Sequence, residues 1–99
     1  MCGIIGINSN RPVSSTIISS LKKLEYRGYD SAGIATLSNN EINEVKSEGR
    51  VDNLENNLLV QKMEGTIGIG HVRWATHGLP NSINAHPHSS QNVSVVHNG

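Results

Sequence analysis

Large apolar side chains are scarce in this sequence, and their scarcity limits what the chain can fold into by itself. The 99 residues contain no Phe, and the only aromatic residues are Tyr26, Tyr29 and Trp74. A chain of this length buries roughly 65% of the surface that its unfolded form exposes, so it is stable only when its core packs closely. We therefore expect at most one small domain, and we interpret the chain as part of a longer protein.

The charge balance argues against two classes of partner. Lys and Arg together number eight, as do Asp and Glu, so the net charge is zero. Neither a basic field for nucleic acid nor a polybasic segment for a membrane surface is present. The longest uninterrupted apolar run is Leu58-Leu59-Val60, too short to cross a membrane, and no signal peptide is recognisable. We therefore expect a cytoplasmic protein that binds neither nucleic acid nor membrane.

The spacing of apolar residues in the first half of the chain predicts strands and one helix. Residues 2–8 alternate small and aliphatic side chains, which favours a short buried strand. Residues 32–37 and 41–46 are expected to form two strands joined tightly at Asn39-Asn40, because Asn tolerates positive φ. Between the strand at residues 2–8 and the strand at residues 32–37, we expect a helix that is opened by Pro12 and ends near Gly28. Its apolar face comprises Val13, Ile17, Ile18, Leu21 and Leu24.

The second half is expected to add a helix, a strand, a polar loop and a last strand. The helix would begin at Asp52 and continue its apolar face through Leu54, Leu58 and Leu59, and the strand would span residues 66–73. Residues 74–91 are irregular and polar, and residues 93–96 are expected to form a buried strand with no later partner. The order of elements favours an α+β fold with antiparallel pairing and helices covering sheet faces.

Cys2 is the only cysteine, which excludes an internal disulfide. If Met1 is removed, the Cys2 thiol stands beside a free α-amino group, whose ordinary pKa of about 7.7–8.0 lets it accept the thiol proton. One residue then supplies both nucleophile and base, which is the pattern of N-terminal-nucleophile enzymes. From position alone, a small buried hydrophobic residue is the more common role of a lone cysteine.

Residues suited to chemistry gather in the last third of the chain. All five histidines lie within residues 71–97, together with the only Trp. Arg73 follows a predicted strand, where its guanidinium could bind a carboxylate through two hydrogen bonds or form a surface ion pair. Asn98-Gly99 could supply a side-chain amide and a backbone N–H to an oxyanion hole, or could form a simple turn.

A small metal-binding module is the alternative from a different class. His86 and His88 lie two residues apart, so an extended segment would present both on one face, and a third ligand would come from His71, His77 or His97. However, no Asp or Glu follows Glu64 in the sequence. Catalytic zinc sites usually include a carboxylate as ligand or supporting residue. We therefore expect no metal and no other cofactor.

Several segments together resemble the class II, N-terminal-nucleophile glutamine amidotransferases. These segments are MCGIIG at the start, YRGYDSAG at 26–33, HVRWATHG at 71–78, NAHPH at 84–88 and HNG at 97–99. They resemble in particular the branch that aminates fructose 6-phosphate, and another class II branch is the alternative. The resemblance implies the N-terminal portion of a four-layer αββα sandwich spanning residues 1–99, incomplete here and without the sugar-phosphate isomerase half.

The resemblance also implies roles for individual residues. Cys2 would attack the glutamine side-chain amide, and Asn98 with the Gly99 N–H would form the oxyanion hole. Arg73 would hold the glutamine α-carboxylate. The other residues implied at the substrate site are Trp74, Thr76 and His77 in a loop that closes over glutamine, with Arg27 and His86 nearby.

The resemblance finally sets expectations for the longer protein. It would pass ammonia from glutamine to fructose 6-phosphate, giving glucosamine 6-phosphate for amino-sugar synthesis, and it would be a homo-oligomer. The acidic residue that recognises the glutamine α-amino group and the half that binds fructose 6-phosphate would both follow Gly99. We therefore expect the 99 residues alone to be inactive.

Overall fold

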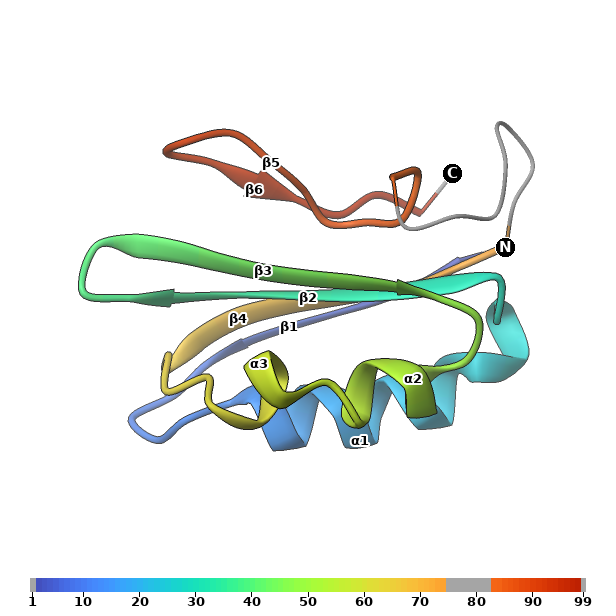
Figure 1. Cartoon of the computed structure of the whole chain (residues 1–99), viewed down its shortest axis with the longest axis horizontal. Coiled ribbons are helices and arrows are strands. Elements are labelled where there is room, and N and C mark those ends of the chain that lie inside the picture. Colours follow the sequence, from blue (N-terminus) through green and yellow to red (C-terminus); the bar gives the residue numbers. More distant parts are fainter. Residues whose placement is uncertain (1, 75–82, 99) are drawn as a thin grey trace.

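Helices and a small hairpin lie on opposite faces of one antiparallel sheet (Figure 1). The structure is a computed structural model that describes residues 2–74 and 83–98. The first half contains β1 (Gly3–Asn8), α1 (Ser14–Leu24), the 3₁₀ helix η1 (Glu25–Arg27), β2 (Ser31–Ser38) and β3 (Glu41–Glu48). The second half contains α2 (Val51–Glu55), α3 (Leu58–Gln61), β4 (Ile67–Arg73), β5 (His88–Ser89) and β6 (Ser94–Val95).

In the sheet, β4 lies between β1 and β2. Among the described residues the strand order is β1-β4-β2-β3, and every neighbouring pair is antiparallel. β2 and β3 are joined at Asn39 and Asn40, whose φ angles of 52° and 63° confirm the predicted tight turn. Because β4 pairs with both β1 and β2, its last residues lie beside the first residues of β1.

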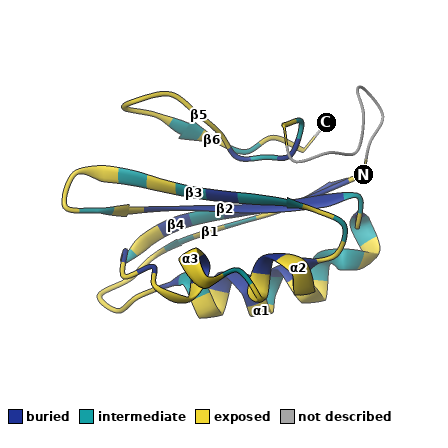
Figure 2. Cartoon of the chain, in the orientation of Figure 1, coloured by how far each residue is buried: buried dark blue, intermediate teal, exposed yellow. Residues whose placement is uncertain are grey.

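The face of the sheet covered by helices carries the apolar core (Figure 2). In α1, Ile17 and Leu21 are fully buried, which confirms the predicted apolar face of that helix. α1 approaches β4 closely, and a Cβ atom at Gly70 would lie 2.6 Å from Ile17 Cγ2. The glycine in the middle strand therefore lets the helix pack directly against the sheet.

The prediction of one helix running from Asp52 through Leu59 was wrong. The segment forms two short helices, because the chain turns at Asn56-Asn57 and the Asn57 side chain accepts the Leu59 N–H at the start of α3. The turn leaves Leu58 and Leu59 exposed, at 66% and 65%, and directs other side chains inward. The buried residues of this region are Val51, Leu54, Val60 and Met63.

The predictions for the first and last strands need correction as well. In β1 burial alternates along the strand, and Ile4 is 47% exposed, because the side chains on the hairpin side are incompletely covered. β6 pairs with the preceding strand β5, and Val95 is 51% exposed rather than buried. None of the helices in the described ranges has the length and apolar character needed to cross a membrane.

The β5–β6 hairpin is held over the other face of the sheet by backbone and polar contacts. A Cβ atom at Gly33 would collide with the His86 carbonyl oxygen, so the chain before β5 passes directly over β2. At the β3 edge, Ser89 Oγ donates to the Glu44 carboxylate, and Lys46 Nζ lies 3.5 Å from the Ile83 carbonyl oxygen. These contacts, together with the buried Ala85 and Pro87, position the hairpin segment over the sheet.

Candidate active site

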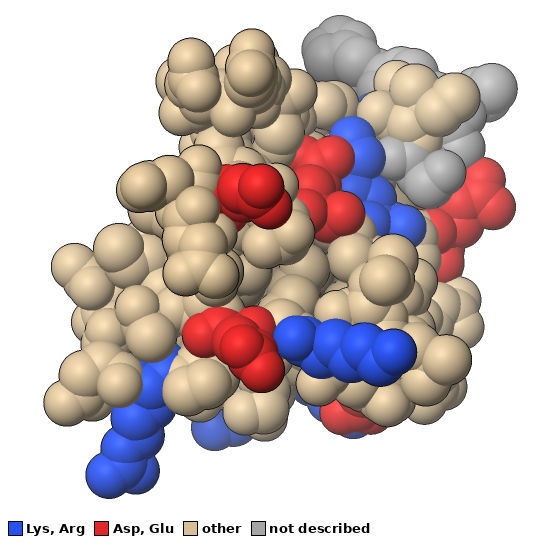
Figure 3. All heavy atoms as spheres, turned by 60° about the vertical axis from the view of Figure 1, so that its left-hand side comes forward, with Lys and Arg blue, Asp and Glu red and all other residues tan. Residues whose placement is uncertain are grey.

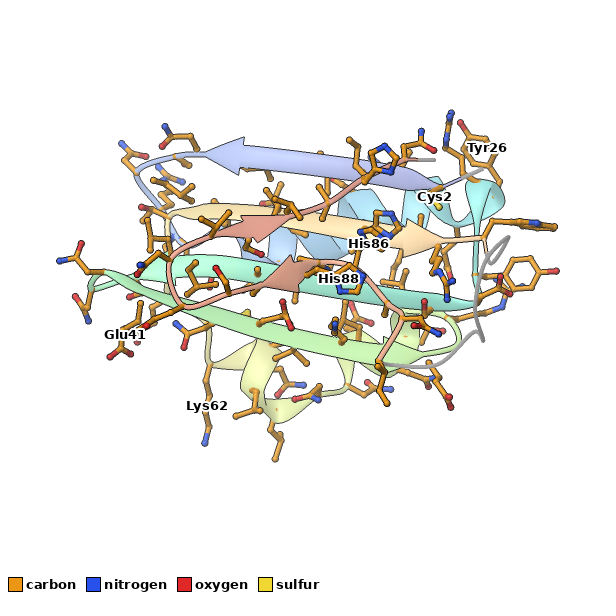
Figure 4. The ribbon with its side chains drawn as sticks, turned by 90° about the horizontal axis from the view of Figure 1, so that it is seen from above. Cys2, Tyr26, Glu41, Lys62, His86 and His88 are labelled. Carbon is orange, nitrogen blue, oxygen red and sulfur yellow. The ribbon has the colours of Figure 1, made fainter. Side chains whose placement is uncertain are left out.

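Cys2 lies at the end of the sheet where β1 begins and β4 ends (Figure 4). It is 5% exposed, and its Sγ lies 4.0 Å from the Trp74 carbonyl oxygen. Its backbone N–H donates to Asn98 Oδ1 over 3.1 Å, which joins residues 96 positions apart in the sequence. The fold therefore brings the backbone of Cys2 into contact with Asn98, the residue predicted for the oxyanion hole.

The orientation of Asn98 matters for its proposed chemistry. Its side-chain oxygen accepts the Cys2 N–H. The other terminal atom of the side chain, the amide nitrogen, is the one that can donate a hydrogen bond. Asn98 can thus hold the nucleophilic residue with one atom and stabilise developing negative charge with the other.

Arg27 fixes the other side of Cys2. η1 continues α1 by one turn, and from it Arg27 Nε donates to the Cys2 carbonyl oxygen over 3.0 Å. The guanidinium makes this a charge-assisted bond, which is stronger than a bond between neutral groups. The structure therefore gives Arg27 a definite contact at the site, where the sequence placed it only nearby.

Arg73 is the last residue of β4, and Trp74 follows it beside Cys2. Arg73 is 7% exposed, and its carbonyl oxygen accepts the Asp30 N–H over 3.1 Å. A Cβ atom at Gly28 would lie 2.5 Å from the Arg73 carbonyl carbon, so the η1–β2 connection packs directly on this backbone. Trp74 is 45% exposed and meets Tyr29 edge-to-face, with ring centroids 5.8 Å apart.

Three histidines stack between the sheet and the hairpin. The His71 and His86 rings are 4.3 Å apart and nearly parallel, and the His88 ring follows 4.5 Å from His86. Burial lowers the pKa of His71. Burial first, and then the neighbouring His71, lower the pKa of His86 to about 4. Both rings are therefore neutral near pH 7.

The histidine stack does not form a metal site. Within residues 2–74 and 83–98, no three His, Cys, Asp or Glu side chains are arranged to hold a metal ion. The His71 and His86 rings face one another, whereas metal ligands direct their nitrogen atoms toward a common point. The sequence alternative of a histidine-based metal module therefore has no support among these residues.

The remaining predicted site residues divide into two groups. His86 is half-buried in the stack just described. Thr76, His77 and Gly99 lie outside the described residues, so the roles implied for them stay predictions.

Sequence reasoning missed two residues that shape this site, His71 and Gly33. His71 appeared only as a possible metal ligand, and Gly33 only as part of a motif. Strand parity was the available signal for His71, because residues 71 and 73 must share a face of β4. Gly33 had no comparable signal, since its contact with the His86 carbonyl group is visible only after folding.

The face of the molecule drawn in Figure 3 shows no field of a single charge sign. On the face drawn in Figure 3, the charged side chains form separate small groups of both signs between uncharged residues. Recognition at the Cys2 site would therefore depend on individual groups such as the Arg73 guanidinium rather than on a field of one sign.

Comparison with curated proteins finds close relatives along the whole chain. No protein-family model matches. The chain is 56% identical over 99 residues to the glutamine–fructose-6-phosphate aminotransferase (isomerizing) of Mesorhizobium japonicum, covering 100% of this chain and 16% of the relative. The enzyme of the same name from Clostridium acetobutylicum is 55% identical over 101 aligned residues, with coverage of 100% and 17%. The chain thus spans about 16% of the length of such relatives.

Solved structures show the same architecture. The glutamine phosphoribosylpyrophosphate (PRPP) amidotransferase from B. subtilis matches 95% of this chain and 20% of its own, with TM-score 0.74 and 25% identity. A structure described as the allosteric regulatory enzyme of purine biosynthesis covers 88% of this chain and 18% of its own, with TM-score 0.77 and 28% identity. The predicted α+β fold, part of an N-terminal-nucleophile amidotransferase sandwich, is thereby confirmed.

Proposed function

We propose that this chain, which corresponds over its whole length to the N-terminal part of the glutamine–fructose-6-phosphate aminotransferases, hydrolyses the side-chain amide of glutamine through Cys2. One observation carries the proposal: Cys2 is held between Asn98 and Arg27, which lie 96 and 25 positions away from it in the sequence. Any buried backbone needs hydrogen-bond partners, but both partners of Cys2 are side chains of residues that the resemblance places at the glutamine site.

The nucleophile in this proposal is the thiol of an N-terminal Cys2. Removal of Met1 converts the Cys2 backbone nitrogen, which lies 3.1 Å from Asn98 Oδ1, into an α-amino group. That amine takes the thiol proton, and the thiolate attacks the amide carbon of glutamine. The amine then returns the proton to the leaving nitrogen, which departs as ammonia and leaves a glutamyl thioester. Water, deprotonated by the same amine, hydrolyses the thioester to glutamate and restores the thiol.

An oxyanion hole and a carboxylate clamp would assist these steps. The Asn98 amide and the Gly99 N–H would donate to the oxyanion of each tetrahedral intermediate. The Arg73 guanidinium would hold the glutamine α-carboxylate through two hydrogen bonds and so orient the side chain toward Cys2. Trp74, Thr76, His77 and His86 would line or close the glutamine site.

The acceptor of the ammonia follows from sequence similarity. Identity of 52–56% to proteins named for fructose 6-phosphate far exceeds the 25% identity to the PRPP amidotransferase. The full-length protein would therefore convert fructose 6-phosphate to glucosamine 6-phosphate for amino-sugar synthesis. We place it in the cytoplasm as a homo-oligomer, which analytical ultracentrifugation of the full-length protein would test.

The test is the substitution Cys2→Ala in the full-length protein. Release of ammonia from glutamine should fall by about 10⁴-fold or more, because the attacking atom is gone. Synthesis of glucosamine 6-phosphate from added ammonia should persist, which serves as the control for folding. A Cys2→Ala protein that hydrolyses glutamine at a near-normal rate would contradict the proposal.

A second variant isolates the role of the α-amino group. A Lys inserted between Met1 and Cys2 keeps the thiol but leaves its nitrogen in a peptide bond, which has no basic lone pair. Intact mass would confirm the new N-terminus, and glutaminase activity should be lost as completely as in Cys2→Ala. Full activity in this variant would rule out the α-amino group as base.

A further inference from the structure

The imidazole of His71 is completely buried at the centre of the sheet. β4 is an interior strand, and the next residue, Val72, packs into the apolar core on the helix side. His71 must therefore face the hairpin. Its exposed fraction is 0%, and its Nε2 lies 2.7 Å from the His97 carbonyl oxygen.

The hydrogen bond fixes the protonation of the ring. A carbonyl oxygen can only accept, so Nε2 must carry the proton. Among the described residues, Nδ1 of His71 is buried with no hydrogen-bond partner. Burial first, and then the charges of Arg73, His88 and His97, keep the pKa of His71 below its ordinary value, although the bond to the His97 carbonyl acts to raise it. His71 is thus a neutral donor with one acceptor, the backbone of His97.

That acceptor lies directly before Asn98. Residues 96–98 follow the end of β6 and have no strand assignment, so no ladder of hydrogen bonds fixes their backbone in place. Two side-chain bonds join this segment to the start and the centre of the sheet: Asn98 Oδ1 to the Cys2 N–H, and the His97 carbonyl to His71. The first bond joins the two residues proposed to act in the reaction, whereas the second joins His71 to the backbone of the residue before Asn98.

We propose that His71 is a positioning residue for the oxyanion hole: by holding the His97 carbonyl, it sets the backbone that presents Asn98 to Cys2. The inference rests on the proposed glutamine hydrolysis. It also explains why a polar ring occupies a fully buried position, since burying an imidazole costs free energy that an apolar side chain of similar size would not. The hydrogen bond to His97 offsets part of this cost and fixes the geometry of the next residue.

The expected effect is on the chemical step. A shift of about 1 Å in a catalytic group can cost about 10²-fold in rate. Loss of the His71 bond should loosen Asn98 without removing it, so we expect kcat for glutamine hydrolysis to fall by about 10- to 100-fold. The KM for glutamine should change little, because the proposed clamp, Arg73, is not replaced in these variants.

The experiment compares His71→Gln with His71→Met in the full-length protein. The Gln amide nitrogen can take the place of Nε2, whereas Met has similar length and volume but no donor. We expect His71→Gln to keep kcat within about threefold of the native protein and His71→Met to lose the 10- to 100-fold. His88→Gln is the matched control, because His88 belongs to the same stack but is exposed on β5, and it should leave kcat unchanged.

Alkylation of Cys2 by iodoacetamide separates positioning from general disruption. The thiolate displaces iodide from a tetrahedral carbon, so this reaction needs the nucleophile but no oxyanion hole. The alkylation rate should be the same in His71→Met and in the native protein. If it falls in parallel with kcat, His71 only stabilises the fold and the inference is overturned.

A second pair covers the case in which His71→Met fails to fold. His71→Asn carries the same amide as His71→Gln but is one carbon shorter, so its nitrogen falls short of the His97 carbonyl. Equal kcat in the Gln and Asn variants would overturn the inference. The proposed function fails on different evidence, namely continued glutamine hydrolysis by Cys2→Ala, so the two failures are distinguishable.

Discussion

The helix-covered face of the sheet buries mainly aliphatic side chains, whereas the largest side chains buried on the hairpin-covered face are polar. Ile34, Val45 and Val72 point toward α1 and α2 and join the apolar core. On the opposite face, Ser31, His71 and Arg73 are just as inaccessible to water. Figure 2 adds the pattern of burial: α1 and α2 both contain buried residues, whereas the hairpin is mostly exposed or intermediate.

The difference shows how each face is held together. Aliphatic packing on the helix face gains free energy in proportion to the area buried and tolerates modest changes in shape. The hairpin face depends on directed contacts, such as His71 to the His97 carbonyl and Gly33 against the His86 carbonyl. A face built this way can hold reactive groups at fixed positions, but it loses function when a single contact is changed.

The largest effect on stability should come from the helix face. Leu21→Ala removes a fully buried side chain of α1 and should lower the free energy of unfolding by about 2–5 kcal/mol. Leu59→Ala, at a position 65% exposed, should change it by less than about 0.5 kcal/mol. Urea unfolding of both variants would measure the contrast, and equal losses would show that α3 packs its leucines inward after all.

The next largest effect should be a loss of glutamine hydrolysis when a contact on the hairpin face is changed. Gly33→Ala places a Cβ against the His86 carbonyl oxygen and 2.9 Å from Pro87 Cδ, so the segment leading to β5 must move away from the sheet. We expect kcat/KM for glutamine to fall by about 10²-fold. Gly6→Ala is the control on the same face, because its nearest neighbour would be Ile69 Cγ2 at 3.8 Å. Similar activities of the two variants would contradict the close approach of hairpin and sheet.

A smaller effect is expected from Arg73→Lys, which keeps the charge at the end of β4. Lys cannot reproduce the two parallel hydrogen bonds of a guanidinium, so the KM for glutamine should rise by about tenfold, or about 1.4 kcal/mol. Arg11→Lys, at an exposed position between β1 and α1, is the matched control and should have no effect. A fall in kcat with unchanged KM would show that Arg73 acts on the reaction step and not on substrate binding.

The smallest effect should be on the pH dependence of stability, through a histidine on the hairpin face. The pKa of His86 is about 4 in the folded protein against 6.5 ordinarily. The unfolded chain therefore binds more protons between these values, and stability present above pH 6.5 is lost as pH falls toward 4. The groups facing His86 are His71, His88, His97 and Arg73. Urea midpoints at pH 7 and pH 5 should differ less in His86→Gln than in the native protein, and an unchanged difference would assign the titration to another group.

Local rules were sufficient for much of the helix face. The apolar face of α1 followed from residues spaced three and four apart, and the β2–β3 turn followed from two asparagines that tolerate positive φ. The break between α2 and α3 was not predicted, because Leu58 and Leu59 fit a helical pattern equally well. The turn at Asn56-Asn57 decided which leucines met the core.

In the candidate site too, the sequence predicted some features and the structure alone showed others. Resemblance of short segments identified Cys2, Arg73 and Asn98 from the sequence, and the structure brings Cys2 and Asn98 into contact. The sequence also supplied Thr76, His77 and Gly99, which remain predictions. It could not supply the bond from Arg27 to the Cys2 carbonyl, because nothing local specifies that pair.

The sequence by itself led to the residues proposed to react and to the periodicity of the elements that carry them. Only the tertiary structure decided that His71 would meet the His97 carbonyl, that Gly33 would lie under the His86 backbone, and that Asn98 would reach Cys2 across 96 positions. The physical reason is that a hydrogen bond forms only when its donor and acceptor, here far apart in the chain, are placed to within a few tenths of an ångström of the right distance. Such distances are set by which face of the sheet the hairpin covers, and no local pattern of residues records that choice.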